Sequence, residues 1–160
     1  MKKFDILFLS FLIIICNSCT KNIFYEDMKT LTRETWHIDS TLHFEFEITN
    51  PNQYYTFYIN IRNNVDFETQ RFWVFLTSEF PNGYIGKDTL GFIICTPAGE
   101  WTGKGNGRLK NNKILYKRQI RFSQEGVYKF SIQQGMPEEN VKGIANFGMT
   151  LLEYKSEYGN

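Results

Sequence analysis

Apolar and polar residues alternate one by one along several stretches of the chain, and this period of two limits the fold more than any other feature. From residue 42 to residue 48, apolar side chains occupy every even position and polar side chains every odd position. The stretches 57–61 and 128–132 alternate in the same way. Because successive side chains of a strand point to opposite faces, the pattern predicts β-strands with one buried face. No stretch has the 3.6-residue apolar spacing of a surface helix, so a parallel α/β fold is not expected.

The predicted strands are short and are separated by turn signals. Asn111 and Asn112 favour a tight hairpin turn, and residues 137–143 favour one helical turn. Aromatic residues, which favour strands and fill cores, make up 17% of the chain. We therefore expect an all-β fold, a single antiparallel β-sandwich of the jelly-roll or immunoglobulin-like type with about eight strands. These strands cover residues 42–48, 57–61, 72–76, 88–96, 101–109, 114–122, 128–132 and 147–151.

The first 19 residues have the pattern of a bacterial lipoprotein signal peptide. Lys2 and Lys3 precede an apolar run over residues 6–16, which is too short to span a bilayer and has the length of a secretory signal core. Ser18 is a small residue directly before Cys19, as cleavage by a lipoprotein signal peptidase requires. A simple cleaved signal or a signal anchor is the alternative.

This pattern predicts the organisation of the chain. Residues 1–18 are a cleaved signal peptide, residues 19–34 a lipidated N-terminus and tether, and residues 35–157 the β-sandwich domain. An irregular first strand is the alternative for residues 20–34. Cys19 would carry a diacylglyceryl and an N-acyl lipid, which together hold a protein stably on a membrane. We expect no other cofactor.

Positive charge is concentrated in one part of the chain. The net charge is +1, which argues against nucleic acid as a partner, yet residues 101–129 hold eight basic side chains and one acidic side chain. Such a block favours docking to an acidic partner or to lipid phosphates, although it is also typical of a solvated hairpin. The candidate docking residues are Lys104, Arg108, Lys113, Lys117, Arg118 and Arg121.

No group of residues indicates catalysis or metal binding, and neither an enzyme nor a small-molecule substrate is expected. His43 and its acidic neighbours at 45 and 47 share one face of a strand, which is typical of a solvent-facing surface. Cys95 is expected to be a buried free thiol. Gly103, Gly105 and Gly107 would leave a bare strip on one face of a strand, where a ring or a backbone can pack closely.

Several segments of the chain match one known family in order and spacing. The strongest stretch is Gly99-Glu100-Trp101-Thr102-Gly103-Lys104-Gly105-Asn106-Gly107. The other matching segments are residues 36–40, 44–48, 58–63, 72–75, 81–83, 88–90, 122–126, 128–130, 134–136, 143–144 and Gly148. Through these segments the chain resembles the gliding motility lipoprotein GldH family of Bacteroidota. It departs from the family pattern at Pro137, where a basic residue is usual, and in the more apolar run 93–95.

The resemblance implies a lipid-anchored, non-catalytic accessory or scaffold protein of the gliding motility and type IX secretion apparatus. Its partners would be other proteins of that apparatus, and its place would be the outer membrane of the cell envelope. We expect it to face the periplasm because no acidic run follows Cys19. The alternative is a surface or periplasmic glycan-binding lipoprotein, which exposed Trp36, Trp73 and Trp101 would favour and buried ones would disfavour.

Overall fold

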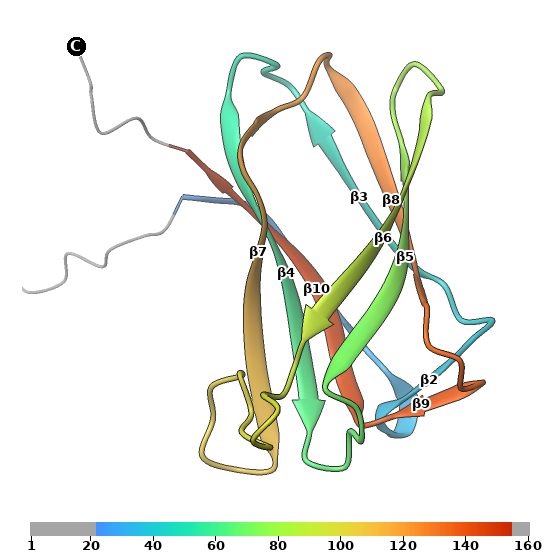
Figure 1. The fold of residues 1–160 in the computed structure, drawn as a ribbon. Coiled ribbons are helices and arrows are strands. Elements are labelled where there is room, and N and C mark those ends of the chain that lie inside the picture. Colours follow the sequence, from blue (N-terminus) through green and yellow to red (C-terminus); the bar gives the residue numbers. More distant parts are fainter. Residues whose placement is uncertain (1–21, 155–160) are drawn as a thin grey trace, which may run out of the picture.

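A computed structural model of the chain describes residues 22–154, and within them the fold is all-β (Figure 1). The expected signal peptide and Cys19 lie outside the described residues. The described part contains ten strands and one three-residue 3-10 helix, η2. The elements are β1 (Ile23–Thr30), η2 (Thr32–Glu34), β2 (Thr35–His37), β3 (Leu42–Ile48), β4 (Tyr54–Asn64), β5 (Arg71–Glu79), β6 (Ile85–Ile93), β7 (Leu109–Arg121), β8 (Gly126–Gln134), β9 (Asn140–Lys142) and β10 (Ile144–Glu153).

Two four-stranded antiparallel sheets form the sandwich, in the orders β1-β10-β4-β7 and β3-β8-β5-β6, and β2 and β9 make a small third sheet. The strand pairing is nested, with early strands pairing with late ones. β1 pairs with β10, β3 with β8, β4 with β7 and β5 with β6. The chain is thus one long hairpin wound into a sandwich, which is the jelly-roll arrangement.

Aromatic and branched side chains fill the space between the sheets. Trp36 is fully buried between the rings of Phe72 and Phe147, and its indole N–H donates to the Ser40 carbonyl at 2.8 Å. Phe46 contacts rings from both sheets, including Phe130. The inward positions of β3 are the even residues, so the alternation read from the sequence correctly places this strand's buried face.

The N-terminal boundary differs from the sequence interpretation. Residues 19–34 were expected to form a tether, but Ile23–Thr30 forms β1 and adds to the sheet beside β10. The inward-pointing side chains of this strand include Tyr25, Asp27 and Lys29, where Asp27 and Lys29 form an ion pair at 2.8 Å. A strand with polar residues on both faces carries no apolar alternation, so the sequence pattern could not indicate it.

Other expectations about the chain's turns were wrong. Asn111 and Asn112 lie inside β7, opposite Arg62 and Ile61 of β4, instead of at a hairpin turn. Residues 137–143 form no helical turn and include β9, which pairs with β2. Gly103, Gly105 and Gly107 lie in the connection between β6 and β7, and not in a strand.

Within residues 22–154, no helix is long and apolar enough to cross a membrane.

Candidate docking surface

The six candidate docking residues are spread along one edge of the sandwich and do not share one hairpin. Lys104 and Arg108 lie in the connection 94–108, and the other four follow one another along β7. β7 is the edge strand of its sheet. At the strand rise, Lys113 and Arg121 are roughly 25 Å apart, so the cations cannot all contact one small partner site.

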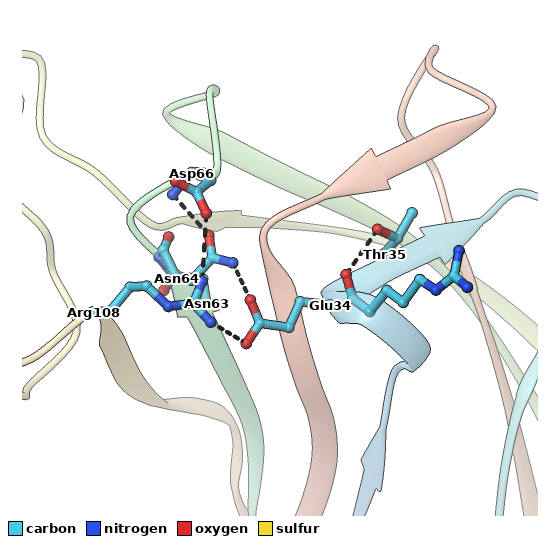
Figure 2. Close-up of polar contacts among 7 residues, drawn as sticks. Glu34, Thr35, Asn63, Asn64, Asp66 and Arg108 are labelled. Carbon is cyan, nitrogen blue, oxygen red and sulfur yellow. Dashed lines mark hydrogen bonds and ion pairs between the residues drawn. The ribbon is translucent and has the colours of Figure 1, made fainter.

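Arg108 is held by an internal network of charged and amide groups (Figure 2). Its guanidinium donates to a Glu34 carboxylate oxygen at 2.5 Å and approaches the Asp66 carboxylate at 3.4 Å. The Asn64 amide nitrogen donates to the other Glu34 oxygen. The hydrogen bond from Arg108, followed by that from Asn64, holds the pKa of the Glu34 carboxyl below its usual value. Arg108 therefore ties the 94–108 connection to η2 and to the β4–β5 connection.

The backbone around this network is strained. Arg33 and Glu34 both lie in the left-handed region, with φ of 55° and 53°. Two neighbours in that region are uncommon for residues other than glycine and persist only where surrounding contacts hold them. Here the Glu34 carbonyl accepts from the Gly143 N–H at 2.9 Å, and its side chain is fixed by Arg108.

A second, buried set of polar bonds explains why Asn112 lies within a strand. Its amide nitrogen donates to the Asn63 side-chain oxygen at 2.9 Å and to the Ile61 carbonyl at 3.2 Å. The Thr102 hydroxyl donates to the Asn112 side-chain oxygen at 3.0 Å. Because the buried amide of Asn112 has partners on β4 and on the 94–108 connection, it cross-links these segments.

A groove of about 700 Å³ crosses the β4–β7 side of the first sheet and is walled by the 94–108 connection. Three cationic side chains line it, Arg62, Lys104 and Lys113, against one carboxylate, Glu26. The Arg62 Nε donates to the Asn111 side-chain oxygen at 2.7 Å, and the Lys113 ammonium lies 4.6 Å from the centre of the Tyr58 ring.

The floor of this groove is a chain of hydrogen bonds across three strands. The Asn60 amide nitrogen donates to the Thr150 hydroxyl at 2.7 Å, and that hydroxyl donates to Glu26 at 3.0 Å. Asn60 and Thr150 are buried although they point to the outer face of the sheet. The single carboxylate of the groove thus has a partner within the sheet, and the groove as a whole favours an anionic partner.

Sequence reasoning missed Arg62, Asn60 and Glu26 because it searched for charge between residues 101 and 129. The useful signal was the period of two in β4, since Arg62 has the same parity as Tyr58 and Asn60 and so faces the same side. The pairing of β4 with β7, which brings Arg62 next to Asn111, could not be read from the sequence.

Lys117, Arg118 and Arg121 lie along the half of β7 that is farther from Lys104. The β4–β7 register shifts twice here, and Gln119 has a φ of 52°. Bulges and long cationic side chains are common means by which an edge strand avoids pairing with another chain. Lys117 and Arg121 also lie over aromatic rings, 4.9 Å from the centre of Tyr116 and 6.0 Å from that of Tyr54.

The remaining candidates have ordinary surroundings. His43, Glu45 and Glu47 are exposed, and the His43 ring bonds to Ser131 at 3.1 Å. Among residues 22–154, no group of three or more His, Cys, Asp or Glu side chains could hold a metal ion. Cys95 is half-buried, which is more exposed than expected, and its thiol donates to the Thr96 carbonyl at 3.4 Å.

The three tryptophans do not form one exposed row. Trp36 is fully buried, Trp101 is half-buried, and Trp73 is 37% exposed on the outer face of β5. The Trp73 ring covers Gly91, where an added Cβ would lie 2.6 Å from a ring carbon, and Arg71 lies 5.3 Å from the ring centre.

Comparison with known proteins identifies the family. Residues 23–151 match the family described as GldH lipoprotein. The chain belongs to the GldH lipoprotein family. A gliding motility lipoprotein GldH homolog of Christiangramia forsetii is 35% identical over 156 residues, which cover 96% of this chain and 95% of that protein. The gliding motility lipoprotein GldH of Flavobacterium johnsoniae is 27% identical over 145 residues, 86% of this chain and 89% of that protein.

Membership of the GldH lipoprotein family makes the protein a gliding-motility lipoprotein, anchored to a membrane of the cell envelope. The family is one of accessory proteins and is not a known enzyme family. Among solved structures, dimeric latent PorU from Porphyromonas gingivalis aligns with 86% of this chain and 14% of its own, at 10% identity and a TM-score of 0.35, a likeness too weak to relate the two folds.

Proposed function

We propose that the protein is a non-catalytic accessory or scaffold component of the gliding motility apparatus and the linked type IX secretion machinery. It acts at the outer membrane through protein–protein contacts, facing the periplasm, and a lipid on Cys19 anchors it. The observation that carries the proposal is the match of residues 23–151, nearly the whole described sandwich, to a family whose curated relatives are named gliding motility lipoproteins.

The contact surface of this proposal is the groove of Arg62, Lys104 and Lys113. It combines three cations with a floor of hydrogen-bonded side chains, so a partner meets an ordered surface of one dominant charge. A segment rich in Asp or Glu, in another protein of the apparatus, is the chemistry that fits it. Arg108 is not included because it does not line the groove; it pairs with Glu34 and Asp66.

The test is a charge reversal in the full, lipidated protein. We expect Lys104→Glu with Lys113→Glu to lower co-purification of apparatus proteins from membranes by about tenfold or more, because like charges would then face each other across the contact. Gliding, or type IX secretion where the organism does not glide, should fall in parallel.

The matched control is Lys87→Glu with Lys142→Glu, which makes the same change in net charge at two exposed lysines outside the groove. Equal amounts of both double variants in the membrane fraction must first be shown by immunoblot. If the groove variant retains its partners and its activity, the groove is not the contact surface.

The glycan-binding alternative has less support. Carbohydrate platforms use several exposed aromatic rings on one face, and of the three tryptophans only Trp73 is exposed. Binding of the purified protein to a glycan array, abolished by Trp73→Ala, would favour that alternative over the scaffold.

A further inference from the structure

We propose that one end of the sandwich, the end at which β1 begins, lies directly on the lipid headgroups and fixes the orientation of the domain on the membrane. The inference rests on the proposed lipid anchor at Cys19. Cys19 precedes Asn22, the first described residue, by three positions. Three extended residues span at most about 10 Å, so the anchor holds this end of the domain close to the bilayer surface.

The hydrogen bonds at this end show which residues the anchor brings to the surface. The Asn22 carbonyl accepts from the Glu153 N–H at 2.8 Å, and the Tyr54 carbonyl accepts from the Tyr154 N–H at 2.7 Å. Tyr54 in turn lies opposite Arg121 at the end of β7. The starts of β1 and β4 and the ends of β10 and β7 therefore form one row across the sheet, which the anchor places next to the membrane.

Three connections lie at the same end, near the top of Figure 1: residues 49–53, 80–84 and 122–125. Glu125 is the single charged residue in these three connections. The three residues of each strand nearest this end add Glu47, Lys87, Arg121 and Glu153, and Glu79 pairs with Lys129 at 3.7 Å. This anchor-side end has little net charge for its size.

More exposed apolar side chains lie at the anchor-side end than at the opposite end. Tyrosine rings favour the headgroup region of a membrane because one end of the ring is apolar and the other forms hydrogen bonds. Tyr84 is 63% exposed in the β5–β6 turn. Each of the others is the first or second residue of a strand that starts at this end: Ile23, Tyr54, Ile85 and Val127. In the connections and last strand residues of the opposite end, three such side chains are exposed: Ile38, Val65 and Ile93.

The opposite end also has little net charge. The connections there cover residues 31–34, 38–41, 65–70, 94–108 and 135–139, together with Gly143, and they hold seven carboxylates and three cations. The three residues of each strand nearest this end add five cations: Lys29, Arg62, Arg71, Lys110 and Lys142. The orientation therefore rests on the position of the anchor and on the apolar side chains, and Lys104 points away from the bilayer.

The test compares two isoleucines of one strand. Ile85 and Ile93 are the first and last residues of β6, are 56% and 55% exposed, and lie roughly 26 Å apart along the strand. Each is replaced by cysteine in the full, lipidated protein carrying Cys95→Ser, and is labelled with bimane. The protein is reconstituted into phosphatidylethanolamine–phosphatidylglycerol vesicles with a nitroxide quencher on the lipid headgroups.

We expect quenching at Ile85→Cys to be at least about threefold stronger than at Ile93→Cys, because headgroups reach only the anchor-side end. A second pair, Asn52→Cys and Glu68→Cys, repeats the comparison at exposed connections if the β6 variants do not fold. Equal quenching at both ends of vesicle-bound protein overturns the orientation and leaves the anchor in place. If the full protein fails to float with the vesicles and behaves like the Cys19→Ala variant, both the anchor and the orientation are overturned.

Discussion

Among single residues, the glycines of the 94–108 connection show how local surroundings decide the effect of a substitution. Gly105 has a φ of 143°, and an added Cβ would lie 2.5 Å from the Leu109 carbonyl oxygen. Gly107, two residues later in the same connection, has nothing within 4 Å of such a Cβ. The two positions therefore differ in whether a side chain can be accommodated, although the sequence presents them as equivalent. They differ because they lie in a loop and not on one face of a strand.

We expect Gly105→Ala to lower the free energy of unfolding by about 1–3 kcal/mol, since alanine must take a strained backbone conformation there. Gly107→Ala should change it by less than about 0.5 kcal/mol. Equilibrium urea denaturation of both variants measures the difference. A bare strip on a strand would make the two substitutions similarly costly, and that result would contradict the loop geometry.

A second residue-scale prediction concerns the ion pair between Arg108 and Glu34. The pKa of Glu34 in the folded protein lies below its ordinary value of 4.5. Its contribution to stability is therefore complete above that value and is lost as the pH falls through the folded pKa. Arg108→Gln removes the main cause of the shift. The free energy of unfolding should then fall less steeply than in the parent protein between about pH 6 and about pH 3.

The measurement is a series of urea titrations across this pH range, with Arg71→Gln as the control. Arg71 is also exposed, and its guanidinium lies over the Trp73 ring, 5.3 Å from the ring centre. Identical pH slopes for parent and Arg108→Gln would show that the ion pair makes no net contribution.

At the scale of elements, β7 has two structurally different parts, although its basic residues form one continuous block of positive charge in the sequence. Its first part lines the groove through Lys113, and its later part carries two register shifts. Tyr116 links β7 to the second sheet, because its hydroxyl donates to Asp88 of β6 at 3.0 Å. Burial, followed by this hydrogen bond, raises the pKa of the Tyr116 phenol, so it remains a donor throughout the physiological range.

If the cations of β7 protect an exposed edge, their loss should promote association between chains. We expect Lys117→Val to increase light scattering during heating more than Lys129→Val does, because Lys129 lies on β8, a central strand with neighbours on both sides. Both changes remove one positive charge and add one valine. Equal scattering would indicate a general effect of net charge and not of the edge.

The sequence could predict some elements because they have one apolar face. The alternation in 42–48 and 128–132 placed β3 and β8, which pair with each other in the structure. β2 and β9 have three residues each, too few to show a period, and β1 has polar residues on both faces. For the site, the sequence located Lys104 and Lys113 by charge. It could not supply Arg62 or Glu26, because these reach the groove only through pairing between strands distant in the chain.

At the scale of the whole molecule, the nested pairing has consequences for folding. β5 and β6 are the one pair of consecutive strands that lie side by side in the two large sheets. Every other pair joins segments farther apart in the chain, and β1 with β10 spans nearly all of it. Because long loops must close before such pairs form, refolding should take milliseconds to seconds.

Two matched substitutions locate the folding nucleus. Leu76 in β5 and Leu151 in β10 are both fully buried, and replacing either by alanine should cost about 2–5 kcal/mol. We expect Leu76→Ala mainly to slow folding and Leu151→Ala mainly to speed unfolding, since the β5–β6 hairpin forms with the shortest loop. Stopped-flow measurements in urea give both rates, and the reverse pattern would place the nucleus at the chain ends.

The place of β1 also determines how the domain resists a mechanical pull. β1 bonds to the rest of the first sheet through β10 alone, and its first residue is the one nearest Cys19. Tension between the anchor and a partner held in the groove would run along the strands, whereas the bonds of an antiparallel ladder lie across them. The load would act in shear on many hydrogen bonds at once, and β1 would not peel away one bond at a time. The segment predicted from the sequence to be a short tether would thus transmit tension from the anchor into the sheet.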